Sequence, residues 1–102
     1  MKKLLTAQST NLSDASNAIV TEAKLKETPF TVHCFGNFDT CTVTVFMSLN
    51  GTSDGVAIDE LTFIEPGFQI MLLPAGVTVW ANVSSAGAST SVSLWVGGQG
   101  AD

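Results

Sequence analysis

The residues that could do covalent chemistry in this chain are one histidine and two cysteines. His33 is the only histidine, and Cys34 and Cys41 are the only cysteines. A cysteine nucleophile needs an imidazole within hydrogen-bond reach and a third group that orients the imidazole. Neighbouring residues of a strand point to opposite faces, which excludes a pair of His33 with Cys34, and a pair with Cys41 has no evident orienting group. We therefore expect a structural histidine.

The two cysteines could instead form a disulfide bond. They lie near the facing ends of two predicted strands around a short loop, so cross-strand pairing could bring them together. A reducing compartment opposes such a bond. We favour free thiols that pack like small apolar side chains, with a disulfide between Cys34 and Cys41 as the alternative.

The carboxylates offer no catalytic or metal-binding pattern. Asp59 and Glu60 are adjacent at the start of a predicted strand, so their side chains diverge and a solvated edge suits them better than an acid–base pair. With Asn50 and Asp54 they could offer oxygen ligands to calcium, but the spacing of a calcium loop is absent. Zinc spacing and a phosphate-binding glycine motif are absent too. The sequence predicts a protein that is not an enzyme and holds no cofactor or metal.

Three aromatic side chains indicate recognition instead of catalysis. Phe46, Trp80 and Trp95 alternate with valines that we expect in the core. Trp80 and Trp95 lie on two consecutive predicted strands, so we expect them side by side on the outer face of one hairpin. Large aromatics on an outer face indicate a surface that a partner covers. The alternative is that the other sheet, or residues 1–27, covers this face within the subunit.

Short alternating strands must position these side chains. The clearest covers residues 41–49 and ends at the Asn50-Gly51 turn, because both residues tolerate the positive φ of tight hairpins. Its expected inner face consists of Val43, Val45, Met47 and Leu49. Further strands are predicted over 30–35, 58–65, 68–73, 77–83 and 90–96, and no stretch has a helical period. Turn signals every 8–12 residues or so indicate one antiparallel β-sandwich, immunoglobulin-like or jelly-roll.

The first 27 residues have a different composition from the rest. They are polar and weakly patterned, and we interpret 1–27 as an extended N-terminal arm and 28–102 as the β-sandwich domain. The arm holds every basic residue of the chain: Lys2, Lys3, Lys24 and Lys26. These lysines are either a solvated tail or a contact for an acidic partner.

Charge and hydropathy narrow the possible partners. Charged residues make up 13% of the chain, about half the ~25% of an ordinary soluble domain, and the net charge is −5. From Glu27 onward every charge is negative, which disfavours nucleic acid. The apolar start at Met1 ends too early for a signal peptide, and no stretch approaches the ~20 apolar residues of a membrane span. We expect a protein made in a cytoplasm that leaves it only within a larger assembly.

Several short phrases of the body resemble a known group of proteins. The strand-loop-strand unit from Thr31 to Leu49 ends in Ser48-Leu49-Asn50-Gly51-Thr52. Pro74-Ala75-Gly76-Val77 then precedes a valine-rich strand, and Ser91-Val92-Ser93-Leu94-Trp95-Val96 follows. In these phrases the region from Thr28 to Gly97 resembles small β-sandwich virion proteins and domains of tailed bacteriophages. That group includes capsid-decorating (cement) proteins, head fibres, and neck or tail accessory proteins. The chain departs from the group at Asn50, where Asp is common, and at Trp80, where a polar or basic residue is frequent.

The resemblance implies a non-enzymatic, capsid-decorating role. Such a protein binds the outside of a phage head as a homotrimer or homodimer and stabilises the contacts between capsomers. Its partners would be the major capsid protein and itself, without nucleic acid or membrane, and its place would be the virion, assembled in the host cytoplasm. We expect an oligomer or capsid interface at Phe46, Trp80, Trp95, Lys2, Lys3, Lys24 and Lys26. The alternatives are a head-fibre, neck or tail accessory protein, or a carbohydrate-binding module in which Trp80 and Trp95 stack on sugars.

Overall fold

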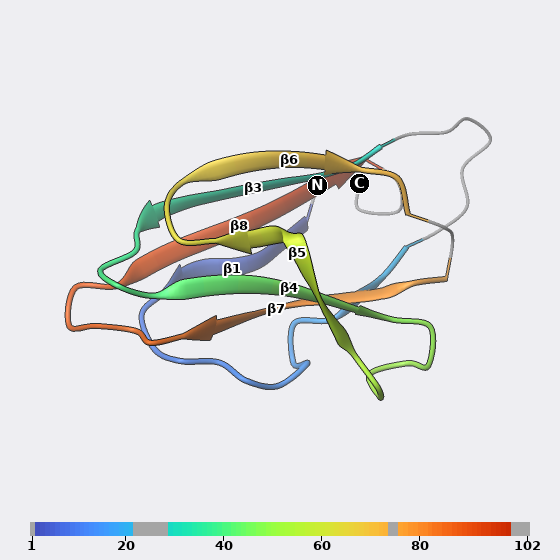
Figure 1. Cartoon of the computed structure of the whole chain (residues 1–102), viewed down its shortest axis with the longest axis horizontal. Helices are drawn as coiled ribbons and strands as arrows, with labels where there is room; N and C mark the ends of the chain where they lie inside the picture. The colour runs from blue at the N-terminus through green and yellow to red at the C-terminus, as the bar shows by residue number, and fades with distance from the viewer. Residues whose placement is uncertain (1, 22–28, 74–75, 99–102) are drawn as a thin grey trace.

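The chain folds into two four-stranded antiparallel sheets that pack face to face (Figure 1). The computed structural model describes residues 2–21, 29–73 and 76–98. Their strands are β1 (Lys2–Gln8), β2 (Ile19–Val20), β3 (Phe30–Asn37), β4 (Thr42–Ser48), β5 (Val56–Phe63), β6 (Gly67–Met71), β7 (Thr78–Ser84) and β8 (Ser91–Gly98). Sheet A has the order β1-β8-β3-β6, and sheet B has the order β2-β7-β4-β5. The predicted all-β sandwich is confirmed.

The core lies between the two sheets and follows the predicted alternation. In β3 and β8 every second side chain is buried: Phe30, Val32, Cys34, Val92, Leu94 and Val96. Sheet B contributes Val43 and Val45 of β4, both with no exposed surface. Burying one such side chain stabilises the fold by about 1.5–3 kcal/mol, so these strands hold the sandwich together. In the parts of the chain that the structure describes, no helix is long and apolar enough to cross a membrane.

The inner face predicted for residues 41–49 is correct as far as Met47 and wrong at Leu49. Met47 is half-buried and packs against the core, whereas Ser48 is buried and Leu49 is 78% exposed. The Ser48 hydroxyl donates to the carbonyl oxygen of Ser53 and accepts from the amide of Asn50. This side chain therefore faces its own turn, and Leu49 is turned outward.

Consecutive strands often belong to different sheets, which the sequence did not predict. β3 lies in sheet A and β4 in sheet B, while β7 lies in sheet B and β8 in sheet A. The two connections contact each other: the amide of Ser89 donates to Asp39 at 2.7 Å, and the Thr90 hydroxyl donates to the carbonyl oxygen of Phe38 at 3.0 Å. Asp39 and Thr40 have φ of 43° and 71°, which turns the chain sharply from one sheet to the other. The expected hairpin of residues 77–96 is therefore a crossing between sheets.

The first 21 residues are extended, but they are part of the sandwich. β1 pairs with β8, and Leu4 and Leu5 are both buried, because a register shift sets two residues of β1 against one of β8. The side chain of Asn17 links β1 to sheet B, donating to the carbonyl oxygen of Leu4 at 3.1 Å and to that of Ala81 at 2.9 Å. The structure thus differs from the separate arm that we predicted. Lys24 and Lys26 lie outside the described residues.

Candidate functional site

The structure separates the histidine from the cysteines. His33 is exposed on the outer face of sheet A, whereas Cys34 and Cys41 are buried in the core and are free thiols. Burial, and to a lesser degree the neighbouring Cys41, raises the pKa of the Cys34 thiol to about 12. Burial also raises the pKa of the Cys41 thiol. Because the thiolate is the nucleophile, neither cysteine is poised for catalysis.

The acidic residues do not converge. Asp59 and Glu60 are exposed on β5, and the carboxylate of Asp54 accepts a hydrogen bond of 3.0 Å from the side-chain amide of Asn50. Within residues 2–21, 29–73 and 76–98, no group of three or more His, Cys, Asp or Glu side chains could hold a metal ion. Asp54, Asp59 and Glu60 therefore belong to no such group.

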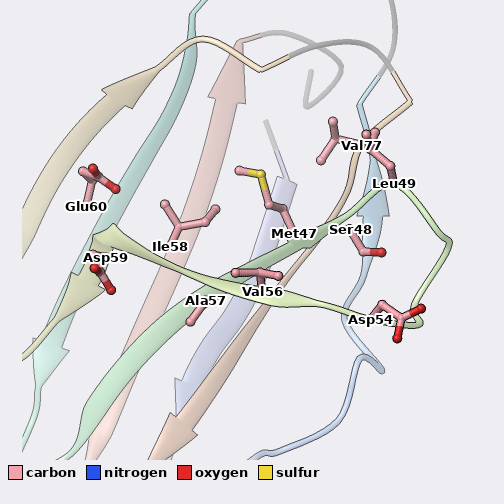
Figure 2. Close-up of a pocket in the computed structure, with 10 residues that line it drawn as sticks. All are labelled: Met47, Ser48, Leu49, Asp54, Val56, Ala57, Ile58, Asp59, Glu60 and Val77. Carbon is pink, nitrogen blue, oxygen red and sulfur yellow. The ribbon is translucent and has the colours of Figure 1, made fainter.

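An apolar groove of about 570 Å³ lies beside the acidic residues of β5 (Figure 2). It lies where β5 bulges: between the pairs Thr44–Thr62 and Phe46–Ala57, one residue of β4 faces residues 58–61 of β5. Met47, Ile58 and Val77 contribute to its wall. The groove is wide and open, with Asp54, Asp59 and Glu60 at its rim.

Phe46 and Trp80 are neighbours on the outer face of sheet B, as their register pairing requires. Their rings stack with centroids 5.9 Å apart and planes 4° apart. Trp80 is only 5% exposed, because Gly55 lies on its ring: a Cβ atom there would be 2.3 Å from Cζ2 of Trp80. Trp80 therefore offers little surface to a partner or a sugar, which favours the alternative that this face is covered within the subunit. The chain after β4 folds back and covers the ring.

Trp95 lies on the opposite side of the molecule, on the outer face of sheet A. The predicted proximity of Trp80 and Trp95 is wrong, since the crossing between β7 and β8 places them in different sheets. Trp95 contacts Phe35 edge to face at 5.2 Å between centroids, and the ammonium of Lys3 lies 4.6 Å from its ring centre. His33 joins this cluster, with its ring 4.8 Å from that of Phe35.

The aromatic cluster continues into an exposed apolar row along β6. Phe68 is 59% exposed and lies 5.9 Å from His33 between ring centroids. Phe68 pairs with His33 and Ile70 with Thr31, so Ile70 also faces outward, and it is 58% exposed. Leu72 follows just beyond the strand and is 67% exposed. We call Phe35, Phe68, Ile70, Leu72 and Trp95 the sheet A patch.

The electrostatics of the sheet A patch are unusual for an acidic protein. None of the four strands of sheet A contains Asp or Glu, and the chain has no charged residue between Pro66 and Gly100. Lys2 and Lys3 of β1 carry the only full charges in these strands. The strands that carry the sheet A patch are therefore neutral to positive.

The sequence indicated one member of the sheet A patch, Trp95, and missed the rest. The signal for Phe68, Ile70 and Leu72 was present, because these residues alternate along one predicted strand. The interleaved Gln69, Met71 and Leu73 do not decide which set faces inward. Only the position of β6 at an edge settles that question.

Comparison with known proteins gave no match: no family model, no curated protein and no solved structure matches this chain. Its function must therefore be inferred from its own surface.

Proposed function

We propose that this chain is a non-enzymatic structural protein of a phage virion, which decorates the outer surface of the head and stabilises contacts between capsomers. The observation that carries the proposal is the sheet A patch, in which three large apolar side chains stand exposed in a row: Phe68, Ile70 and Leu72. Exposed apolar patches of this kind mark binding surfaces for other proteins. The virion setting comes from the resemblance of the body to small β-sandwich virion proteins.

The energetics suit an assembly of many copies. Fully burying one large apolar side chain is worth about 1.5–3 kcal/mol, and about three-fifths of that remains available at each of the three exposed residues. Together they offer about 3–5 kcal/mol, which is less than most estimates of the cost of associating two proteins. A single contact through this row is therefore weak. On a lattice, several linked contacts raise the total affinity by effective concentration, which is how a decorating protein would hold a shell.

Charge selects which side of the protein meets the shell. The acidic Asp54, Asp59 and Glu60 lie along one side of sheet B, while Lys2 and Lys3 lie in sheet A beside the patch. An acidic partner surface would attract the sheet A side and repel the other. Such steering acts mainly on the association rate and weakens as salt is added.

Counting the protein in purified virions tests the proposal. Quantitative mass spectrometry of particles from the phage that encodes it should find hundreds of copies per head. A handful of copies would favour the head-fibre, neck or tail alternative, and absence from the particles would contradict both.

A binding assay tests the surface itself. Purified protein should bind heads that lack it, and the double variant Phe68→Ser with Ile70→Ser should lose that binding. The matched control is Val56→Ser, which removes an equally exposed apolar side chain from sheet B. If the control loses binding and the double variant retains it, the sheet A patch is not the contact.

A second candidate function, carbohydrate binding, has one observation in its favour. A hollow of about 200 Å³ on sheet A lies between His33, Phe68 and Trp95, with aromatic rings in its wall. Phe68 rather than Trp80 would be the stacking platform, because Trp80 is covered. A glycan array would detect such binding, and Phe68→Ala should abolish it; no bound glycan would eliminate this candidate.

A further inference from the structure

We propose that β6 is an assembly edge at which two copies of this chain pair strand to strand. The two β6 strands would run antiparallel about a two-fold axis through Gln69, joining two copies of sheet A into one eight-stranded sheet. This inference deepens the proposed function and rests on it for its biological setting, because it names the protein's first partner as a second copy of itself.

Three of the four edge strands in the described chain are protected against such pairing. β1 carries Lys2 and Lys3 and has two irregularities in its register with β8. β5 carries Asp59 and Glu60 and is bent by its bulge. β2 has only two residues. Charges, bulges and shortness are the devices that keep sheet edges from pairing with another chain.

β6 has none of these devices. It pairs with β3 over five consecutive residues without a shift, from Gly67 against Cys34 to Met71 against Phe30. It contains no charge and no proline, and in the described chain no strand pairs with its other side. Figure 1 shows it beside β3, along the margin of the molecule. An exposed, regular, apolar edge is a template for strand addition.

The strand is complementary to itself in the register centred on Gln69. In that register Phe68 of each copy lies opposite Ile70 of the other, and both side chains are on the outer face. Pairs of an aromatic with a β-branched residue are among the favourable cross-strand contacts. The two Gln69 side chains meet at the axis, and an amide can both donate to and accept from its twin. A two-fold contact of this kind is closed, so it yields a dimer and not a fibre.

Charge favours a second copy at this edge. Each copy carries a net charge of −5, so two copies repel each other over most of their surface. Sheet A, whose strands contain no carboxylate, is the side on which that repulsion is least. Pairing there also joins the two sheet A patches into one continuous surface, twice as large as either.

Light scattering after size-exclusion chromatography tests the proposal on the whole chain. The wild type should have twice the chain mass of 10.6 kDa. Gln69→Lys should have the single mass, because it sets two ammonium groups opposite each other at the axis. Val56→Lys is the control, since it adds the same charge to the β5 edge at a residue that is 67% exposed. It should remain a dimer.

Several results would overturn the proposal. A wild type that stays monomeric up to about 1 mM would overturn it. A Gln69→Lys variant with the wild-type mass, or a wild type with the mass of a trimer, would also overturn it. Circular dichroism and thermal unfolding of the variants exclude a loss of mass through misfolding.

Cross-linking tests the register independently of any charge. Residues directly opposite each other have Cβ atoms about 4.5–5.5 Å apart, while residues two positions off are about 7–8 Å apart. Under a mild oxidant, Gln69→Cys should therefore form a disulfide-linked dimer much faster than Phe68→Cys. The native Cys34 and Cys41 are buried and should not compete. Faster cross-linking at position 68 would overturn the two-fold axis at Gln69.

The outcomes distinguish this inference from the proposed function. A dimer that is sensitive to Gln69→Lys but absent from virions would refute the decorating role and leave the β6 pairing intact. A monomer in solution that nevertheless decorates heads would refute the β6 pairing between copies, and a strand of the shell would then be the natural occupant of the edge.

Discussion

Both outer faces of the sandwich carry aromatic residues, but the chain covers those on sheet B and leaves part of those on sheet A exposed. On sheet B, Trp80 stacks on Phe46, and the chain around Gly55 covers it until it is 5% exposed. On sheet A, Trp95 packs against Phe35 and Lys3, but the row continues into Phe68, which is 59% exposed. An aromatic residue on the outer face of a strand therefore does not by itself indicate a partner. What decides is whether the chain itself crosses that face.

The edge strands of the two sheets also differ in how well they are protected against pairing with another chain. Sheet B ends in the bulged, acidic β5, and sheet A ends in the regular, uncharged β6. The turn before β5 covers Trp80 at Gly55, and the bulge within β5 disrupts the edge of the sheet. Among residues 2–21, 29–73 and 76–98, no such feature covers the β6 side of sheet A, so both its face and its edge are available there.

The largest expected effect is a difference in the free energy of unfolding between two variants, Trp80→Ala and Trp95→Ala. Trp80→Ala removes a buried, stacked side chain and should lower the free energy of unfolding by about 3–5 kcal/mol. Trp95→Ala removes a partly exposed one and should lower it by less than about 2 kcal/mol. Urea unfolding of both variants measures the difference. Equal losses would mean that the two faces are covered to the same extent.

The next effect concerns the glycine that covers Trp80. Gly55→Ala places a Cβ atom against the indole ring, so the turn or the ring must shift, and we expect a loss of about 1–3 kcal/mol. Gly51→Ala is the control for the ring contact: a Cβ there contacts nothing within 4 Å, so it should lose stability only through the φ of 62° that alanine disfavours. Tryptophan fluorescence should change only in Gly55→Ala. An unchanged spectrum would show that Gly55 does not lie on Trp80.

The buried thiols predict a loss of stability at high pH. The Cys34 thiol has an ordinary pKa of 9.0, and folding raises it to about 12, so the folded state holds the proton more tightly. Stability from this group is complete below pH 9 and falls between pH 9 and 12, by at most about 1.4 kcal/mol per pH unit. Urea unfolding at pH 8 and pH 10.5 measures the slope. Cys34→Ala should show a shallower slope, and an equal slope would assign the loss to other groups.

The smallest effect concerns the lysine above Trp95. Lys3→Met keeps the apolar stem and removes the ammonium, so it should cost about 0.5–1 kcal/mol of stability through the lost cation–π contact. Lys2→Met is the matched control on the same strand and should change stability less. If both variants behave alike, the contact with Trp95 contributes nothing measurable.

Local pattern was sufficient to predict the strands of the body, from β3 to β8, but not their placement. The alternation around Val43 and Val45 identified a core strand, because burial on one face is a local property. The sheet to which each strand belongs depends on contacts such as that between Asp39 and Ser89, which are 50 residues apart. Because β7 and β8 have the sequence pattern of an ordinary hairpin, Trp80 and Trp95 were wrongly predicted to lie side by side.

The N-terminal strand was missed for a related reason. Leu4 and Leu5 are adjacent, so they fit neither a strand with one buried face nor an amphipathic helix. Both are buried because a bulge in β1 turns two consecutive side chains inward. The bulge depends on how β1 pairs with β8, so the residues of β1 alone do not predict it.

The central claim is that sheet A, and not sheet B, meets the protein's partners. The most direct test is the mass in solution of two variants that add the same charge to exposed apolar residues, Ile70→Lys in sheet A (58% exposed) and Val56→Lys in sheet B (67% exposed). We predict that Val56→Lys keeps the wild-type dimer and that Ile70→Lys is a folded monomer. A monomeric Val56→Lys beside a dimeric Ile70→Lys would contradict the claim.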